Sequence, residues 1–327
     1  MKITCLAVSL VWSLAISGQV PSQERISGPF THENLSLFLV KAPKGDAPGS
    51  RRYLTLKDAL DQKKVAVIEI QKVNELAVQN VSDEDIYIQS GDIVKGGQQD
   101  RVITNDFVLP PRSGRVSVAA FCVEQGRWSQ RGEESVSTFN SSSELAATKP
   151  LKVAVGIRKD QSEVWQQVAA TQAGLAMSTA QTVTVSASAS SLPLTLKSRP
   201  VEDAVKSYTK ALRRITDGKS DVVGLVFAVN GEINSADVYS SPELFAAMWP
   251  KLLKASAVEA LRLKRREPSA TTEVAAVDQF LRDAETGADT KIDIDRRITL
   301  VRRENDREIT LESRDQQGWI HRSVIKK

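Results

Sequence analysis

Two polar loops in the first half of the chain carry the side chains best suited to contacting a ligand. Residues 95–101 have the sequence KGGQQDR, and residues 125–128 have the sequence QGRW. Paired glycines allow backbone N–H groups to approach an anion closely, and Arg and Trp are frequent in binding hot spots. We therefore predict a binding site where the two loops meet, although a pair of tight, solvated turns would leave the same pattern. The predicted ligand-binding residues are Lys95, Gly96, Gly97, Gln98, Gln99, Asp100, Arg101, Gln125, Arg127 and Trp128.

Four carboxylates in the same stretch offer a second kind of chemistry. They are Asp92, Asp100, Asp106 and Glu124. Two carboxyl groups can act as acid and base when burial separates their pKa values, and Asp100 and Glu124 are the candidate catalytic pair. Carboxylates close to arginine are far more often members of structural ion pairs, so the sequence favours a protein that is not an enzyme.

The sequence contains few residues suited to other kinds of catalysis or to metal binding. His32 and His321 are the only histidines, and they lie at opposite ends of the chain. With Cys122 they offer at most three zinc ligands, so we expect no metal and no cofactor; a site built from carboxylates alone stays open. The glycine patterns of nucleotide-binding loops and the G-x-S-x-G elbow of serine hydrolases do not occur. Cys122 ends an apolar strand, where a small buried hydrophobe is the ordinary interpretation.

Residues 1–18 are typical of an export signal. Lys2 precedes an apolar run over residues 3–16, and Ala15-Ile16-Ser17 supplies small residues at a cleavage spacing. This run is shorter than the roughly 20 residues that cross a bilayer. We expect a cleaved signal and a periplasmic or secreted mature chain with no transmembrane span. An uncleaved anchor or an apolar N-terminal strand is the alternative.

The charge balance argues against nucleic acid as a partner. The chain has 44 basic and 40 acidic residues, for a net charge of +4. The basic clusters are diluted by acidic neighbours, whereas nucleic-acid binding needs a coherent basic stripe. After signal removal Cys122 is the single cysteine, which excludes an internal disulfide and leaves stability to burial.

Residues 30–158 are predicted to form a β-rich part. Apolar, β-branched runs alternate with turn-forming clusters at 35–40, 65–70, 75–79, 85–89, 101–104, 107–109, 115–124 and 152–158. Many short strands at close spacing favour an antiparallel sandwich or a barrel-like sheet. A short helix over residues 56–60 is expected after Thr55, which can act as its N-cap.

Residues 159–327 are predicted to mix helices and hairpins. Apolar spacing predicts helices over 162–177, 200–215 and 241–263, and Pro250 should kink or split the last one. Asn230-Gly231 predicts a hairpin between strands at 222–229 and 232–239, and further strands follow at 292–301, 307–312 and 318–325. The serine-rich tract 178–191 is either an edge strand or a loop. Strands followed by helices and hairpins packed on them favour an α+β fold, with both parts in one composite domain.

Several segments resemble a family whose biochemical role is unknown. They are GDIVKGGQQDRVI at 91–103, DFVLPPRSG at 106–114, FCVEQGRW at 121–128, the hairpin and long helix over 224–261, and GWIHRSVI at 318–325. These segments are similar to the ARG-and-rhodanese-phosphatase-superfamily-associated protein family, and the resemblance covers nearly the whole mature chain. It implies a link to ADP-ribose or to phosphorylated ligands. It supplies no catalytic residues to carry over.

Three hypotheses for function follow. The first is a non-catalytic envelope module that binds an anionic small molecule or an envelope protein at the Gly96-Gly97 and Gly126–Trp128 loops. The second is a carboxylate-driven hydrolase acting on an ADP-ribosyl, phosphoryl or glycosyl substrate. The third is a structural protein without a small-molecule pocket. The sequence favours the first.

Overall fold

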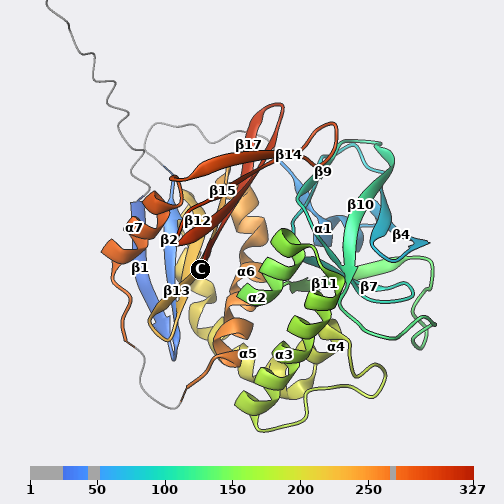
Figure 1. The fold of residues 1–327 in the computed structure, drawn as a ribbon, viewed down its shortest axis with the longest axis horizontal. Helices are drawn as coiled ribbons and strands as arrows, with labels where there is room; N and C mark the ends of the chain where they lie inside the picture. Colours follow the sequence, from blue (N-terminus) through green and yellow to red (C-terminus); the bar gives the residue numbers. More distant parts are fainter. Residues whose placement is uncertain (1–24, 43–51, 266–269) are drawn as a thin grey trace, which may run out of the picture.

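An eight-stranded antiparallel sheet draws on both ends of the chain (Figure 1). The computed structural model describes residues 25–42, 52–265 and 270–327. The strand order is β1-β2-β12-β13-β17-β16-β15-β14, so β2 near the N-terminus pairs with β12 from the second half of the chain. The strands are β1 (Arg25–His32), β2 (Leu35–Lys41), β12 (Val222–Val229), β13 (Glu232–Tyr239), β14 (Ala288–Asp293), β15 (Thr299–Glu304), β16 (Glu308–Asp315) and β17 (Gly318–Lys326).

Both faces of this sheet are covered, which explains the uninterrupted apolar run of β12. Every residue of β12 is buried, since helix α6 (Pro242–Arg262) packs on one face and α7 (Val274–Asp283) belongs to the core on the other. Asn230 and Gly231 both have positive φ and make the tight turn to β13, as predicted. Helix α6 runs through Pro250 as one helix, so the predicted split is wrong, and the alternative of a kink stays a prediction. Burial along most of α6 outweighs the hydrogen bond lost at proline.

The second sheet is barrel-like, as the strand spacing predicts. Its six antiparallel strands follow the order β11-β7-β8-β10-β5-β4. A bridge between Ile68 and Thr138, with a hydrogen bond of 2.9 Å from the Glu69 N–H to the Ser137 carbonyl, brings the first and last strands together. The strands are β4 (Val65–Lys72), β5 (Glu75–Asn80), β7 (Asp92–Gly96), β8 (Arg101–Ile103), β10 (Gly114–Cys122) and β11 (Phe139–Leu145).

A small third sheet and a short helix extend this barrel-like part. Strands β3 (Leu54–Thr55), β6 (Ile86–Ile88) and β9 (Phe107–Leu109) form the sheet, and Leu56, Ile86 and Phe107 share one apolar core with the barrel strands. Helix α1 (Leu56–Asp61) begins after Thr55, whose hydroxyl accepts the Asp58 N–H at 3.2 Å. The predicted cap at Thr55 is confirmed.

A layer of helices packs at the junction between the two large sheets and below it in the view of Figure 1. One apolar cluster joins side chains of β2 and β12 to those of β7 and β8, so the two halves of the chain share a core. The helices of this layer are α2 (Lys149–Val153), the π-helix Ala154–Arg158, α3 (Gln161–Thr179), α4 (Leu192–Leu196), α5 (Arg199–Leu212) and the 3-10 turn Arg213–Thr216.

Three predicted segments need correction or completion. Residues 152–158 form the end of α2 and the π-helix in place of a strand, because Thr148 caps a helix that has Pro150 in its first turn. The single strand predicted over 292–301 is a hairpin of β14 and β15. The tract 178–191 is mainly loop with one isolated bridge, Val185 to Ser188.

Within the described residues, no helix combines the length and apolar character needed to cross a membrane. The predicted export signal, residues 1–18, lies outside the described residues.

Candidate functional site

The two glycine loops meet at one end of the barrel-like sheet. Arg127, in the loop after β10, donates from Nη1 to the Gly97 carbonyl at 3.0 Å and from Nη2 to the Gly96 carbonyl at 3.1 Å. Gly97 has φ of +55°, and a Cβ there would lie 2.2 Å from Cζ of Phe139. Only glycine fits this turn, so its backbone lies directly against the aromatic ring.

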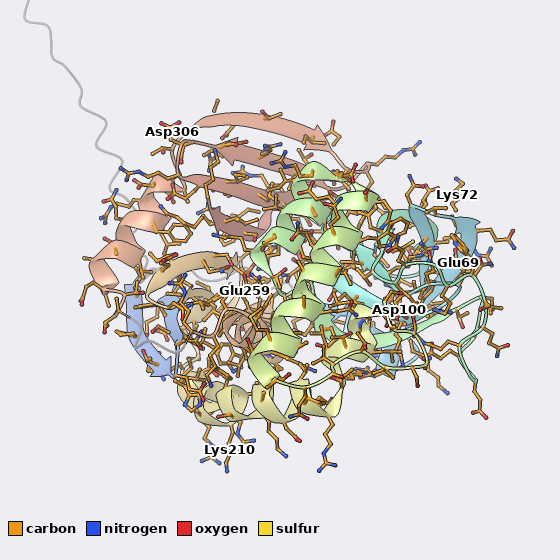
Figure 2. The ribbon with its side chains drawn as sticks, turned by 60° about the horizontal axis from the view of Figure 1, so that its bottom comes forward. Glu69, Lys72, Asp100, Lys210, Glu259 and Asp306 are labelled. Atoms are coloured by element: carbon orange, nitrogen blue, oxygen red, sulfur yellow. The ribbon has the colours of Figure 1, made fainter. Side chains whose placement is uncertain are left out.

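Asp100, near the end of the first loop, is fully buried, and Figure 2 shows it in the barrel-like part of the molecule. Its carboxylate makes a two-pronged ion pair with Arg131, with Nη1–Oδ2 and Nη2–Oδ1 both at 2.8 Å. The Ser191 hydroxyl donates to Oδ2 at 2.6 Å, and the Gly96 N–H donates to Oδ1 at 3.0 Å. Such paired, charge-assisted bonds fix the carboxylate firmly in one position.

Glu124, also fully buried, completes the cluster. It accepts from Arg127 Nε at 2.7 Å, from Arg131 Nη1 at 3.0 Å and from the Asp100 N–H at 2.9 Å. Burial alone would raise the pKa of Glu124, but hydrogen bonds from Arg127, Ser188 and the Asp100 backbone, with the Arg131 charge, hold it below its usual value. Glu124 is therefore ionised at neutral pH, with no proton to donate to a leaving group. We call Asp100, Glu124, Arg127 and Arg131 the loop network.

Arg101 points to the opposite side of β8 from Asp100. Its Nη1 donates to the Val73 carbonyl at 2.8 Å and contacts the Cys122 sulfur, and its Nη2 pairs with Glu69 at 3.2 Å. The Trp128 ring lies 5.7 Å from this guanidinium, in cation–π geometry. Burial raises the pKa of the Cys122 thiol to about 11, which makes it a poor nucleophile and agrees with its interpretation as a buried hydrophobe.

Few of the predicted binding residues face solvent. Trp128 is 48% exposed, Gln125 is exposed, and Gln98 is half-buried. Lys95 is half-buried and pairs with Glu134 at 2.7 Å. Next to them is an open depression lined by Lys95, Arg131, Gly132, Glu133, Glu134, Asn140, Ala187 and Leu194. The role of the loops in ligand binding stays a prediction.

Gln99 differs from the other residues of these loops. It is 1% exposed, and neither its side-chain nitrogen nor its side-chain oxygen has a hydrogen-bond partner among the described residues. A buried amide without partners costs free energy, which hydrogen bonds to a bound group would recover. Gln99 therefore has hydrogen-bonding capacity that the described protein does not use.

The structure contains a second buried cluster that sequence reasoning did not predict. Of its members, Asp106 had been named as a candidate carboxylate. His321 on β17 contacts Asp106 through Nδ1 at 2.9 Å and Asp237 on β13 through Nε2 at 3.2 Å. Lys152 on α2 donates to Asp237 at 3.0 Å, and the Ser313 hydroxyl donates to Asp106 at 2.5 Å. We call Asp106, Lys152, Asp237 and His321 the junction network, because it joins the barrel-like part, the helix layer and the large sheet.

The two carboxylates keep His321 protonated. Burial alone would lower the pKa of His321, but the charges and hydrogen bonds of Asp106 and Asp237 raise it to about 9. Burial opposes ionisation of both aspartates as well, yet His321 and, for Asp237, Lys152 lower their pKa values. Tyr239 stacks on the imidazole with ring centroids 4.7 Å apart. The junction network is thus a balanced set of two anions and two cations.

One sequence signal pointed to His321 without identifying its partners. In GWIHRSVI, residues 321, 323 and 325 alternate onto one strand face, and the apolar Ile325 suggests that this face is buried. Because Asp106 is 215 residues away, no local spacing relates the two residues. Within the part of the chain that the structure describes, no group of three or more His, Cys, Asp or Glu side chains could hold a metal ion.

Fold and site together define an α+β protein in which two loops close over a buried ion-pair network at the end of a barrel-like sheet. Residues 23–325 match the ARG and Rhodanese-Phosphatase-superfamily-associated Protein domain, a domain of unknown function, and the chain belongs to this family. No curated protein and no solved structure matches the chain.

Proposed function

We propose that the protein is an exported binding module of the cell envelope that binds a ligand or partner through the rim of the two glycine loops. One observation carries this choice over a hydrolase: Asp100 and Glu124 are both buried and both paired with Arg131. Carboxylates held in this way stabilise loops, whereas general acid catalysis needs a carboxyl group that retains a proton near neutral pH.

The loop network supports binding because it fixes the geometry of the rim before a ligand arrives. Arg127 ties its own loop to the carbonyls of Gly96 and Gly97. Trp128 follows in sequence and lies over the buried Arg101 guanidinium, with nearly half of its surface exposed. A fixed, exposed aromatic side chain loses little conformational entropy on binding, which favours affinity.

The candidate ligand is an anionic small molecule that carries a ring, with an envelope protein as the alternative partner. An exposed Trp128 suits stacking against a ring. The resemblance to a family associated with ADP-ribosylglycohydrolase and rhodanese-like phosphatase proteins favours ADP-ribosyl or phosphorylated compounds. Export rests on residues 1–18 of the sequence.

Thermal unfolding with ADP-ribose, and separately with inorganic phosphate, tests this proposal. A ligand at a hundred times its Kd stabilises the folded protein by about 2.7 kcal/mol. We expect ADP-ribose to raise the Tm of the wild type, Trp128→Ala to lose most of this increase, and Met177→Ala to keep it. Met177 is the matched control because it is 83% exposed and lies on α3, outside the loops.

Two results would contradict a site at Trp128. One is a Tm that neither ADP-ribose nor phosphate changes. The other is an equal increase in Tm for the Trp128→Ala variant, which would show that the ligand binds elsewhere. Turnover of ADP-ribose that Glu124→Gln abolishes without unfolding the protein would favour the hydrolase.

A further inference from the structure

A partly enclosed cavity lies beside the junction network, away from the glycine loops. The barrel-like part contributes Ser90 and Asp106, the π-helix contributes Gly156, and the large sheet contributes Asp237 and His321. Helix α2, which leads into the π-helix, lies at this junction in Figure 1. π-Helical turns are rare and occur frequently at functional sites.

The cavity carries unused hydrogen-bond acceptors. An ionised carboxylate offers about four acceptor positions. Within the described structure, Asp237 accepts one hydrogen bond on each oxygen, from His321 and from Lys152. Both nitrogens of His321 are already engaged with carboxylates. A ligand in this cavity is therefore recognised chiefly by the hydrogens that it donates.

Charge balance selects an uncharged ligand. The two carboxylates of the junction network are matched by the His321 imidazolium and the Lys152 ammonium, so an added ion would have no counter-charge in this buried cluster. One further cation, Lys159, donates to Asn105 on the cavity wall at 3.2 Å. Lys159 is exposed, so solvent screens its charge.

The remaining walls of the cavity are apolar and favour contact with a small carbon skeleton. Leu300, Leu311 and Ile325 line the large-sheet side of the cavity, and Val155 lines the π-helix side. The cavity volume is about 40 Å³, enough for roughly three water molecules at 10–15 Å³ each. Two neighbouring carbons with their hydroxyl groups have comparable dimensions.

We propose that this cavity binds a small, uncharged diol through its pair of adjacent hydroxyl groups. The hydroxyls donate to Asp237, which keeps a free acceptor position on each oxygen, and the carbon skeleton lies against Leu311 and Ile325. This site shares no residue with the glycine loops, so it stands independently of the function proposed there.

A matched pair of probes tests the proposal on the full chain. Ethane-1,2-diol and ethanol have the same two-carbon skeleton, which fits the cavity volume, and differ by one hydroxyl, so the ratio of their Kd values isolates the second hydrogen bond. We expect the diol to bind at least tenfold more tightly in ligand-observed NMR titrations, because a hydrogen bond to a charged group contributes at least this factor. Acetate and inorganic phosphate should not compete with the diol.

Variants at Gly156 test whether the diol binds in this cavity. A Cβ at Gly156 would lie 3.5 Å from Leu311 Cδ1 and 3.7 Å from Ser90 Oγ, so alanine fits in ordinary contact. We expect Gly156→Ala to weaken diol binding with an unchanged Tm, Gly156→Leu to abolish it, and Asp237→Asn to weaken it at least tenfold. Trp128→Ala should leave diol binding unchanged, which separates this site from the loop rim.

Three outcomes would overturn the proposal. Equal affinity for diol and alcohol would show that the carboxylates do not recognise the hydroxyl pair. Tighter binding of acetate or phosphate than of the diol would show that the ammonium group of Lys159, and not the carboxylate of Asp237, determines which ligand binds. Diol binding that Gly156→Ala and Asp237→Asn both leave intact would place the diol outside this cavity.

Discussion

Replacing Arg131 with methionine is expected to destabilise the protein by about 3–5 kcal/mol, the usual cost of removing one partner from a buried ion pair. The Arg131 side chain is 5% exposed and pairs with Asp100, Glu124 and Glu134. Methionine keeps much of the volume, but among the described cations it leaves the two buried carboxylates only Arg127 as an ion-pair partner. Urea unfolding at neutral pH measures the loss directly, as a lower midpoint.

Arg112→Met is the matched control for this measurement. Arg112 also forms a two-pronged pair, with Asp83, but the two side chains are 64% and 81% exposed. Exposed pairs contribute about 0–1 kcal/mol. If Arg131→Met cost no more than Arg112→Met, the loop network would not hold the two loops together.

A loss of stability at alkaline pH is the second large expected effect. His321 has a pKa raised from 6.5 to about 9 in the folded protein, which corresponds to about 3 kcal/mol. Because the folded pKa is the higher one, this stabilisation is fully present below pH 6.5 and is lost as the pH rises through 9. The free energy of unfolding should therefore fall by about 3 kcal/mol across this window.

The groups around His321 support this assignment. The charged and titratable side chains that face it are Asp106, Asp237, Lys152, Tyr87 and Tyr239. Both aspartates have lowered pKa values, and both tyrosines have pKa values raised by burial, so these four keep their charge states between pH 6.5 and 9. Urea unfolding of His321→Gln at both pH values is the control. If the free energy of unfolding of His321→Gln fell with pH as steeply as that of the wild type, the loss of stability would belong to another group.

Local sequence signals predicted local structure well. Asn230-Gly231 specified its hairpin, and Thr55 specified its helix start, because each residue acts on its own backbone neighbours. The same kind of signal misled at residues 152–158, where β-branched residues suggested a strand. Capping by Thr148 and packing against the large sheet, including Leu311 near Gly156, favour helix there.

Sequence reasoning placed the two loops together, but it gave neither the orientations of their side chains nor the partner of their carboxylates. Residues 95–101 and 125–128 do come together, but the sequence could not tell which charged groups face inward. Arg131, the partner of both carboxylates, lies in a loop with no periodic pattern and was absent from the predicted set. The junction network was harder still, because its contacting pairs His321–Asp106, Lys152–Asp237 and His321–Asp237 lie 84 to 215 positions apart in the sequence.

Titration of the Glu124 carboxyl group by ¹³C NMR is the most direct test of a binding rim built over a structural ion-pair network. The chemical shift of the carboxyl carbon reports its protonation as the pH is lowered from neutrality. We predict a pKa below the usual 4.5, because Arg127 and Arg131 stabilise the ionised form more than burial opposes it. A pKa above 4.5, and above all one near neutrality, would contradict this arrangement and favour a carboxyl group prepared to donate a proton.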